Sequence, residues 1–305
     1  MNPEQPEEDF RERENLWRTP EIYLAGKHVS LQSLKERRIQ NAYLGKNITP
    51  YPSPVEFWVS DVTHITKKPG YEEIMKSEAF KPGKEFSWWS LKINENEIRE
   101  AEERYMERNN VLEPFLKKFT TSPAFKPESR FGNYRFTFPL TDLLKWYKEQ
   151  NCGGKEPVLR VHETVIYKQK IMYTVLIHSP EDNKGFGKYP LLENSECVNY
   201  QDGKIVWKAQ AICETHSYKF VAGTAIKNEY PVYYVWDQVC LVFHLPPPKT
   251  LKISRGDLEN SFSPCELMTN KKDNQTHVEY LEAVKKMEEL KVSKKQEKKK
   301  PKERK

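Results

Sequence analysis

The end of one apolar segment carries residues that could bind a polar ligand. His64 and Thr66 close the run VEFWVSDVTHIT, so an imidazole and a hydroxyl lie where a buried strand should open to solvent. An imidazole there can form a hydrogen bond or move a proton near neutral pH. Taken alone, such a histidine more often pairs with a backbone carbonyl than with a ligand. Tyr134 and Glu229 have equally ordinary interpretations, as a core aromatic residue and an exposed strand-edge carboxylate.

Three segments become more informative when they are taken in chain order. The first is His64-Ile65-Thr66, with Gly70-Tyr71 and a short helical pattern behind it. The second is GNYRF, residues 132–136, and the third is NEYPVYYVWDQV, residues 228–239. Together they resemble the three motifs of the ADP-ribosyltransferase superfamily, especially its poly(ADP-ribose) polymerase-type branch. The resemblance spans residues 55–244, most of the expected folded body.

The resemblance implies that the chain transfers ADP-ribose from NAD to a macromolecular acceptor. Cleavage of the bond between nicotinamide and ribose passes through an oxocarbenium-like state, which a nearby carboxylate can stabilise. By resemblance, Glu229 is this catalytic carboxylate. It would hold the nicotinamide ribose and polarise the attacking group of the acceptor.

The same resemblance implies which residues bind NAD, the expected cosubstrate. His64 and Thr66 would hydrogen-bond the ribose on the adenosine side. Tyr134 would pack on the nicotinamide end, with Trp146 or Tyr147 from the following helix behind it.

Two positions depart from the family pattern. Ile65 stands where the family usually has glycine, and a β-branched side chain could crowd the ligand there. Pro231 interrupts the strand after Glu229 and removes a ladder hydrogen bond. Two functions therefore stay open: an NAD-dependent transferase, and a catalytically inactive protein of the same fold, a pseudoenzyme that binds protein or nucleic acid.

The elements that must position these residues alternate at first and then become strands. The patterns predict strands at 55–65 and 133–138, helices at 69–80, 94–109 and 140–150, hairpins over 157–179 and 197–213, and strands over 228–245. Asn94 and Glu97 have the spacing of a capping box. This order predicts an α+β fold with bent, mainly antiparallel sheets and flanking helices.

Composition divides the chain into three parts. Residues 1–54 are expected to be a polar N-terminal extension with a helix at 28–44, and residues 55–247 the ADP-ribosyltransferase-like domain. Residues 248–305 are expected to be a polar linker, a helix at 276–291 and a disordered basic tail.

Charge and cysteine content narrow the range of possible partners and cellular compartments. The chain has a net charge of +6, but residues 284–305 hold eleven Lys or Arg and four Glu, so the tail carries +7 and the rest −1. The tail could contact nucleic acid or import machinery, or simply be solvated. Five scattered cysteines, a charged N-terminus and no long apolar run favour a cytoplasmic or nuclear protein without a membrane span. Cys213 and His216 form only half of a zinc site, so no metal is expected.

Overall fold

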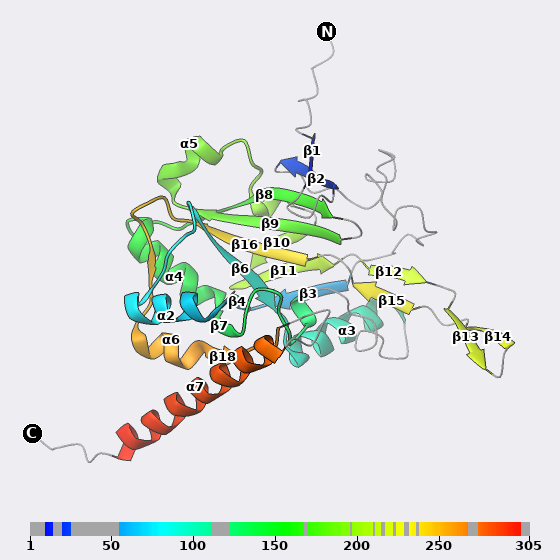
Figure 1. Ribbon diagram of the computed structural model, residues 1–305. Helices are drawn as coiled ribbons and strands as arrows, with labels where there is room; N and C mark the ends of the chain where they lie inside the picture. Colours follow the sequence, from blue (N-terminus) through cyan, green and yellow to red (C-terminus); the bar gives the residue numbers. More distant parts are fainter. Residues whose placement is uncertain are drawn as a thin grey trace, which may run out of the picture.

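The computed structural model shows how these elements are arranged (Figure 1). It describes residues 10–14, 20–25, 55–110, 123–167, 170–195, 197–209, 211–214, 217–221, 224–228, 232–235, 238–267 and 274–299. From residue 55 strands alternate with helices as far as residue 151, and mostly strands follow. The α+β class with mainly antiparallel sheets is therefore confirmed.

A nine-stranded sheet forms the centre of the molecule. From edge to edge its strands are β1 (Phe10–Glu14), β2 (Pro20–Ala25), β8 (Val158–Tyr167), β9 (Lys170–His178), β16 (Gln238–His244), β6 (Phe86–Lys92), β4 (Asp61–Thr66), β7 (Tyr134–Pro139) and β18 (Phe262–Pro264). Every neighbouring pair is antiparallel except β9 and β16, which run parallel. The sheet thus includes the strands of the first two sequence segments, β4 and β7, whereas the third segment contributes only Gln238 and Val239 at the start of β16.

Smaller sheets complete the β structure. A three-stranded sheet consists of β10 (Val198–Gln201), β11 (Lys204–Ala209) and β3 (Val55–Val59). Three two-stranded pairs are β12 (Ala211–Glu214) with β15 (Val232–Val235), β13 (Ser217–Val221) with β14 (Thr224–Asn228), and β5 (Ala79–Phe80) with β17 (Leu251–Lys252). The turn between β10 and β11 is the predicted Asp202-Gly203, with φ of 50° and 79°. The hairpin β8–β9 is also confirmed.

The single strand predicted for residues 55–65 is in fact two strands in two sheets. β3 pairs with β11, whereas β4 pairs with β6 and β7. Ser60 lies at the break, and its N and Oγ both donate to Oε1 of Glu97, at 3.1 and 3.2 Å. Glu97 belongs to helix α3 (Glu95–Asn109) and also completes the predicted capping box with Asn94. Alternation alone cannot show such a break, because the bond that permits it comes from a distant helix.

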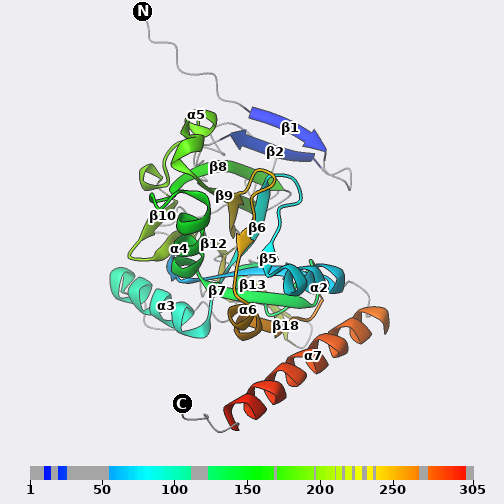
Figure 2. The ribbon, with the colours of Figure 1, turned by 90° about the vertical axis from the view of Figure 1, so that its left-hand side faces the viewer.

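Three helices lie against one face of the main sheet, as Figures 1 and 2 show. They are α2 (Lys68–Ser77), α4 (Leu140–Asn151) and α6 (Arg255–Ser261). Tyr71 of α2 stacks on Tyr134 of β7 with ring centres 4.7 Å apart, and Tyr147 of α4 contacts Phe243 of β16 at 5.3 Å. The shorter elements are α5 (Asn183–Phe186) and the 3-10 turns η2 (Pro123–Phe125), η3 (Pro180–Asp182) and η4 (Leu192–Asn194).

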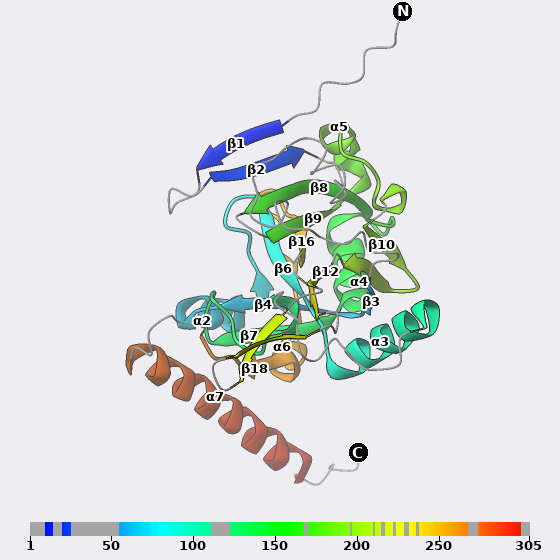
Figure 3. The ribbon, with the colours of Figure 1, turned by 90° about the vertical axis from the view of Figure 1, so that its right-hand side faces the viewer.

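The folded body continues past the predicted boundary at residue 247. Leu251, Leu258 and Phe262 are buried, and β18 pairs with β7 at the edge of the main sheet. Helix α7 (Asn274–Lys299) then packs Ala283 into the core and extends away from the body (Figure 3). Because α7 reaches Lys299, the first half of the predicted disordered tail is helical, whereas residues 300–305 lie outside the described residues.

The N-terminal extension also differs from the prediction. β1 and β2 form a hairpin, and β2 pairs with β8 at the other edge of the main sheet. Residues 10–25 therefore add two strands to the domain rather than standing apart from it. The helix predicted at 28–44 lies outside the described residues.

Candidate functional site

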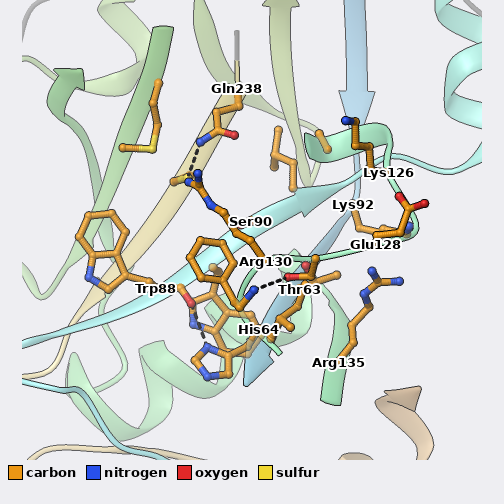
Figure 4. A pocket seen from close by; sticks show the side chains of 18 residues that line it. Thr63, His64, Trp88, Ser90, Lys92, Lys126, Glu128, Arg130, Arg135 and Gln238 are labelled. Atoms are coloured by element: carbon orange, nitrogen blue, oxygen red, sulfur yellow. Dashed lines mark hydrogen bonds between the residues drawn. The ribbon is translucent and has the colours of Figure 1, made fainter. Parts of the chain in front are cut away.

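A pocket of about 380 Å³ opens on the main sheet (Figure 4). Residues of β4, β6 and β16 form its floor, and residues 124–131 form a wall. Its volume lies within the range of roughly 300–1,000 Å³ that small-molecule sites occupy.

Strand alternation decides which side chains reach this pocket. Trp88 is 47% exposed and lines it, whereas Trp89 is 1% exposed and packs among core aromatic residues. Ile65 of β4 pairs with Arg135 of β7, and both line the pocket. Tyr134, one residue before Arg135, therefore faces the opposite side and stacks on α2. The pocket thus lies on the face of the sheet that α2 does not cover.

Positive charge dominates one side of the pocket. Lys92, Lys126, Arg130 and Arg135 line it, and Glu128 is the one carboxylate among the described residues that line it. No ion pair joins any of these four cations to a carboxylate of the described residues. Figure 4 shows Lys92, Lys126, Glu128 and Arg135 on one side and Trp88 on the opposite side. The pocket is therefore suited to an anionic ligand that also carries a planar apolar group.

Arg135 is the most unusual of these side chains because it is only 9% exposed. Its Nη2 donates to the backbone oxygen of Pro127 at 2.5 Å and to Sγ of Cys265 at 2.8 Å. Its Nε is buried and has no hydrogen-bond partner within the part of the chain that the structure describes. Buried charges are normally paired, since the loss of hydration is costly. Among the described residues no carboxylate pairs with this guanidinium, so the site is suited to an anionic ligand.

The titratable groups around the pocket favour binding over nucleophilic attack. Burial, and then the charge of Arg135, lower the pKa of Lys92. Burial raises the pKa of the pocket-lining thiol Cys240 to about 11, so it stays protonated at neutral pH. Burial also raises the pKa of Cys265, against the lowering effect of Arg135. Neither thiol is therefore an activated nucleophile.

His64 borders the pocket but has a structural hydrogen bond. Its Nδ1 lies 2.9 Å from the backbone oxygen of Trp88, so Nδ1 donates. Its ring packs against Phe80 and Trp89 at 5.0 and 5.3 Å, and burial lowers its pKa. The imidazole bridges β4 and β6 just past the last residue pair that joins them, Thr63 and Ser90. His64 therefore pairs with a backbone carbonyl, as strand-end histidines usually do, although it lies at the edge of a pocket.

Thr66 and Tyr134, two of the residues expected to bind NAD, lie away from the pocket lining. They pair with each other across β4 and β7. Tyr134 is 2% exposed and packs between Tyr71 and Phe262. Thr66 Oγ1 occupies the space beside Gly70, where an added Cβ would lie only 2.0 Å from it. Both side chains thus pack between the sheet and α2.

Tyr147 has no exposed surface, and Glu229 cannot be placed. The hydroxyl of Tyr147 donates to the backbone oxygen of His244 at 2.8 Å, and burial raises its pKa. In this conformation Tyr147 cannot contact a cofactor. Glu229, the expected catalytic residue, lies outside the described residues. The described structure therefore gathers His64 and Gln238 at the pocket but not Thr66, Tyr134 or Tyr147.

The prediction from sequence missed Arg135 and Lys92. The alternation of residues 133–138 contained a signal for Arg135, because a strand that buries Tyr134, Phe136 and Phe138 on one face turns Arg135 to the other. The pairing of β7 with β4 and of β4 with β6 places both residues in one sheet, and the charge of Arg135 contributes to lowering the pKa of Lys92. That strand order could not be deduced from the sequence.

The described residues contain neither a candidate metal centre nor a candidate membrane span. Groups of three or more His, Cys, Asp or Glu side chains that could hold a metal ion do not occur among them. None of the described helices is long and apolar enough to cross a membrane. Comparisons of the chain with protein-family models, with curated proteins and with solved structures find no match.

Proposed function

We propose that this protein binds NAD in the pocket formed by β4, β6, β16 and residues 124–131. One observation carries the proposal: the buried Arg135 guanidinium has no carboxylate partner among the described residues, and the exposed indole of Trp88 lies on the opposite side of the same pocket (Figure 4). Guanidinium and ammonium groups suit the pyrophosphate of a dinucleotide. An exposed indole suits stacking by adenine or nicotinamide.

The choice of NAD among nucleotides rests on the resemblance to ADP-ribosyltransferases. The first segment contributes His64 and Ile65 to the pocket, and the third contributes Gln238. The second segment contributes Arg135 from the neighbouring strand. All three segments therefore border one pocket, although the residues of each that border it differ in part from those first expected.

Transfer of ADP-ribose is the reaction we propose for an active form. The bond between C1′ of the ribose and the nicotinamide nitrogen breaks, and nicotinamide leaves with the electron pair. A nucleophilic oxygen or nitrogen of a protein or nucleic acid then bonds to C1′, and its proton passes to Glu229 or to solvent. The reaction requires the Glu229 carboxylate to reach the pocket.

Binding without transfer is the second candidate, and two placements favour it. Tyr134 faces α2 rather than the pocket, and the β-branched Ile65 lines the pocket where a glycine is expected. A pseudoenzyme of this kind would present bound NAD, or the pocket itself, to a protein or nucleic acid of the cytoplasm or nucleus.

Two assays test the proposal. Calorimetric titration with NAD and with ADP-ribose measures binding, and labelled NAD measures nicotinamide release and label transfer. Glu229→Gln removes the proposed catalytic carboxylate, and Glu149→Gln, an exposed change on α4, is the matched control. Binding with turnover that only Glu229→Gln abolishes supports the transferase, and binding without turnover supports the pseudoenzyme. Failure of both NAD and ADP-ribose to bind at millimolar concentration would overturn the proposal.

A further inference from the structure

We infer that Arg135 and Lys92 form a phosphate subsite at one side of the pocket, while Trp88 receives the planar ring of the ligand at the other. The ring position rests on the proposed function. The phosphate position rests on the charges and hydrogen bonds of the chain itself, so it can be tested with inorganic pyrophosphate alone.

Arg135 is held in a fixed orientation before any ligand binds. Its Nη2 is bound to the backbone oxygen of Pro127 and to Sγ of Cys265. The thiol of Cys265 also donates to that same oxygen at 3.1 Å, so both side chains hold the pocket wall. The wall is further fixed where Ser129 N donates to the oxygen of Glu266 at 2.8 Å. A guanidinium oriented in this way loses little rotamer entropy when a phosphate oxygen binds it.

Two features indicate that the missing partner is an anion. The Nε of Arg135 is buried without a partner, although five N–H groups of an arginine normally find acceptors. Lys92 is partly buried on the same side of the pocket as Arg135 (Figure 4), and the like charge of Arg135 contributes to lowering the pKa of Lys92. A bound phosphate would relieve both the missing hydrogen bond and the repulsion between the two cations.

The carboxylate of Glu128 restricts where a phosphate can bind among the cations of the pocket. It lines the pocket near Lys92 and Lys126 in Figure 4, but forms no ion pair with either. Its carboxylate would repel a phosphate placed beside it, so the phosphate is expected nearer Arg135 than Lys126. Arg130 is exposed and lies toward Gln238 in Figure 4, where it suits a contact with the middle of the ligand.

The test is a calorimetric titration of the full chain with inorganic pyrophosphate and, separately, with NAD. Arg135→Gln and Lys92→Gln each remove one cation of the subsite, and Lys184→Gln removes an exposed cation of α5 as the control. Because a charged hydrogen bond to phosphate is worth about 1.5–3 kcal/mol, each subsite variant should weaken pyrophosphate binding by about 10-fold to 100-fold. The control should bind like the wild type. Lys92→Gln keeps the test valid if Arg135→Gln lowers the thermal midpoint, since Lys92 is less buried.

The outcomes separate this inference from the proposed function. Pyrophosphate binding that both substitutions weaken, with no binding of NAD, would support the subsite and reject the proposed function. NAD binding that neither substitution weakens would support the proposed function and overturn the subsite. Absence of pyrophosphate binding to the wild type would also overturn the subsite.

Discussion

Tyr134 and Arg135 are adjacent in the sequence, but their side chains lie on opposite faces of strand β7. Tyr134 was the residue that the motif resemblance selected, and it packs on α2. Arg135 was not selected, and it lines the pocket with an unpaired Nε. A one-residue step along a strand moves a side chain to the other face, so a motif match cannot by itself assign a ligand contact.

Trp88 should contribute to ligand binding rather than to stability, since nearly half of its surface is exposed. We expect Trp88→Ala to weaken NAD binding by about 10-fold, in line with roughly 1–3 kcal/mol for stacking of a base on an aromatic side chain. Trp88→Phe should retain most of the affinity, because it keeps an aromatic face. Calorimetric titration of both variants measures the effect, and equal affinity of Trp88→Ala and the wild type would place the ring elsewhere.

Buried histidines should make the fold sensitive to acid. Burial lowers the pKa of His162 to about 4, and burial is also the largest cause of the lowered pKa of His178. Nε2 of His178 accepts from Nε of Arg160 at 3.0 Å while its Nδ1 donates to the oxygen of Ser179 at 2.7 Å, an arrangement that requires a neutral ring. Below the unfolded pKa of about 6.5, the unfolded chain binds protons that the folded chain does not, so stability falls as pH decreases toward the folded pKa.

Urea denaturation at about pH 7.5 and about pH 5 measures this effect. We expect His162 alone to lower the free energy of unfolding at the lower pH by about 1 kcal/mol, about half of what the full pKa shift would give between these two pH values, to allow for its partial exposure. His162→Gln should shrink the difference between the two pH values, which separates the histidine from the carboxylates. A stability that stays constant or rises on acidification would contradict the assignment.

At the scale of elements, the junction between β4 and β7 depends on a glycine. Gly132 has φ of +153°, and a Cβ there would lie 2.1 Å from the backbone oxygen of Thr66. Gly132→Ala should therefore force β4 and β7 apart and lower the free energy of unfolding by about 3 kcal/mol or more. Gly83→Ala, where a Cβ would meet nothing within 4 Å, is the control and should change stability little. Chemical denaturation of both variants checks this, and equal stability would mean that the junction is not tightly packed.

Local signals predicted the elements well, and long-range pairing limited the rest. The capping box of Asn94 and Glu97, helix α4 and the turn at Asp202-Gly203 follow from neighbouring residues, and all are confirmed. The break at Ser60 depends on a distant carboxylate, and the parallel pairing of β16 with β9 joins segments far apart in the chain. No local pattern contains that information. For the same reason the sequence could indicate individual site residues but not which face of the sheet they share.

At the scale of the whole molecule, the first part of α7 packs against the folded body and its last part is basic. Ala283 is fully buried, Met287 and Leu290 pack against the core, and Glu282 pairs with Lys68 of α2 at 2.8 Å. The residues from Lys294 onward are mostly basic. We expect deletion of 294–305 to leave the thermal midpoint nearly unchanged and to remove salt-sensitive binding to single-stranded DNA, because such binding depends on Lys and Arg.

Deletion of 274–305 is the contrasting variant. It also removes Ala283, Met287 and Leu290 from the core and should lower the thermal midpoint clearly. Thermal denaturation of both truncated chains measures the difference. If deletion of 294–305 alone destabilises the fold, or leaves DNA binding intact, the division of α7 into these two parts is wrong.

The central claim is that the pocket between Arg135 and Trp88 holds a nucleotide, and a crystal structure of the chain with NAD tests it most directly. We expect density for the pyrophosphate within hydrogen-bond distance of Nε of Arg135 and for a planar ring against Trp88. Density for NAD elsewhere on the molecule, or an empty pocket in crystals saturated with NAD, would contradict it.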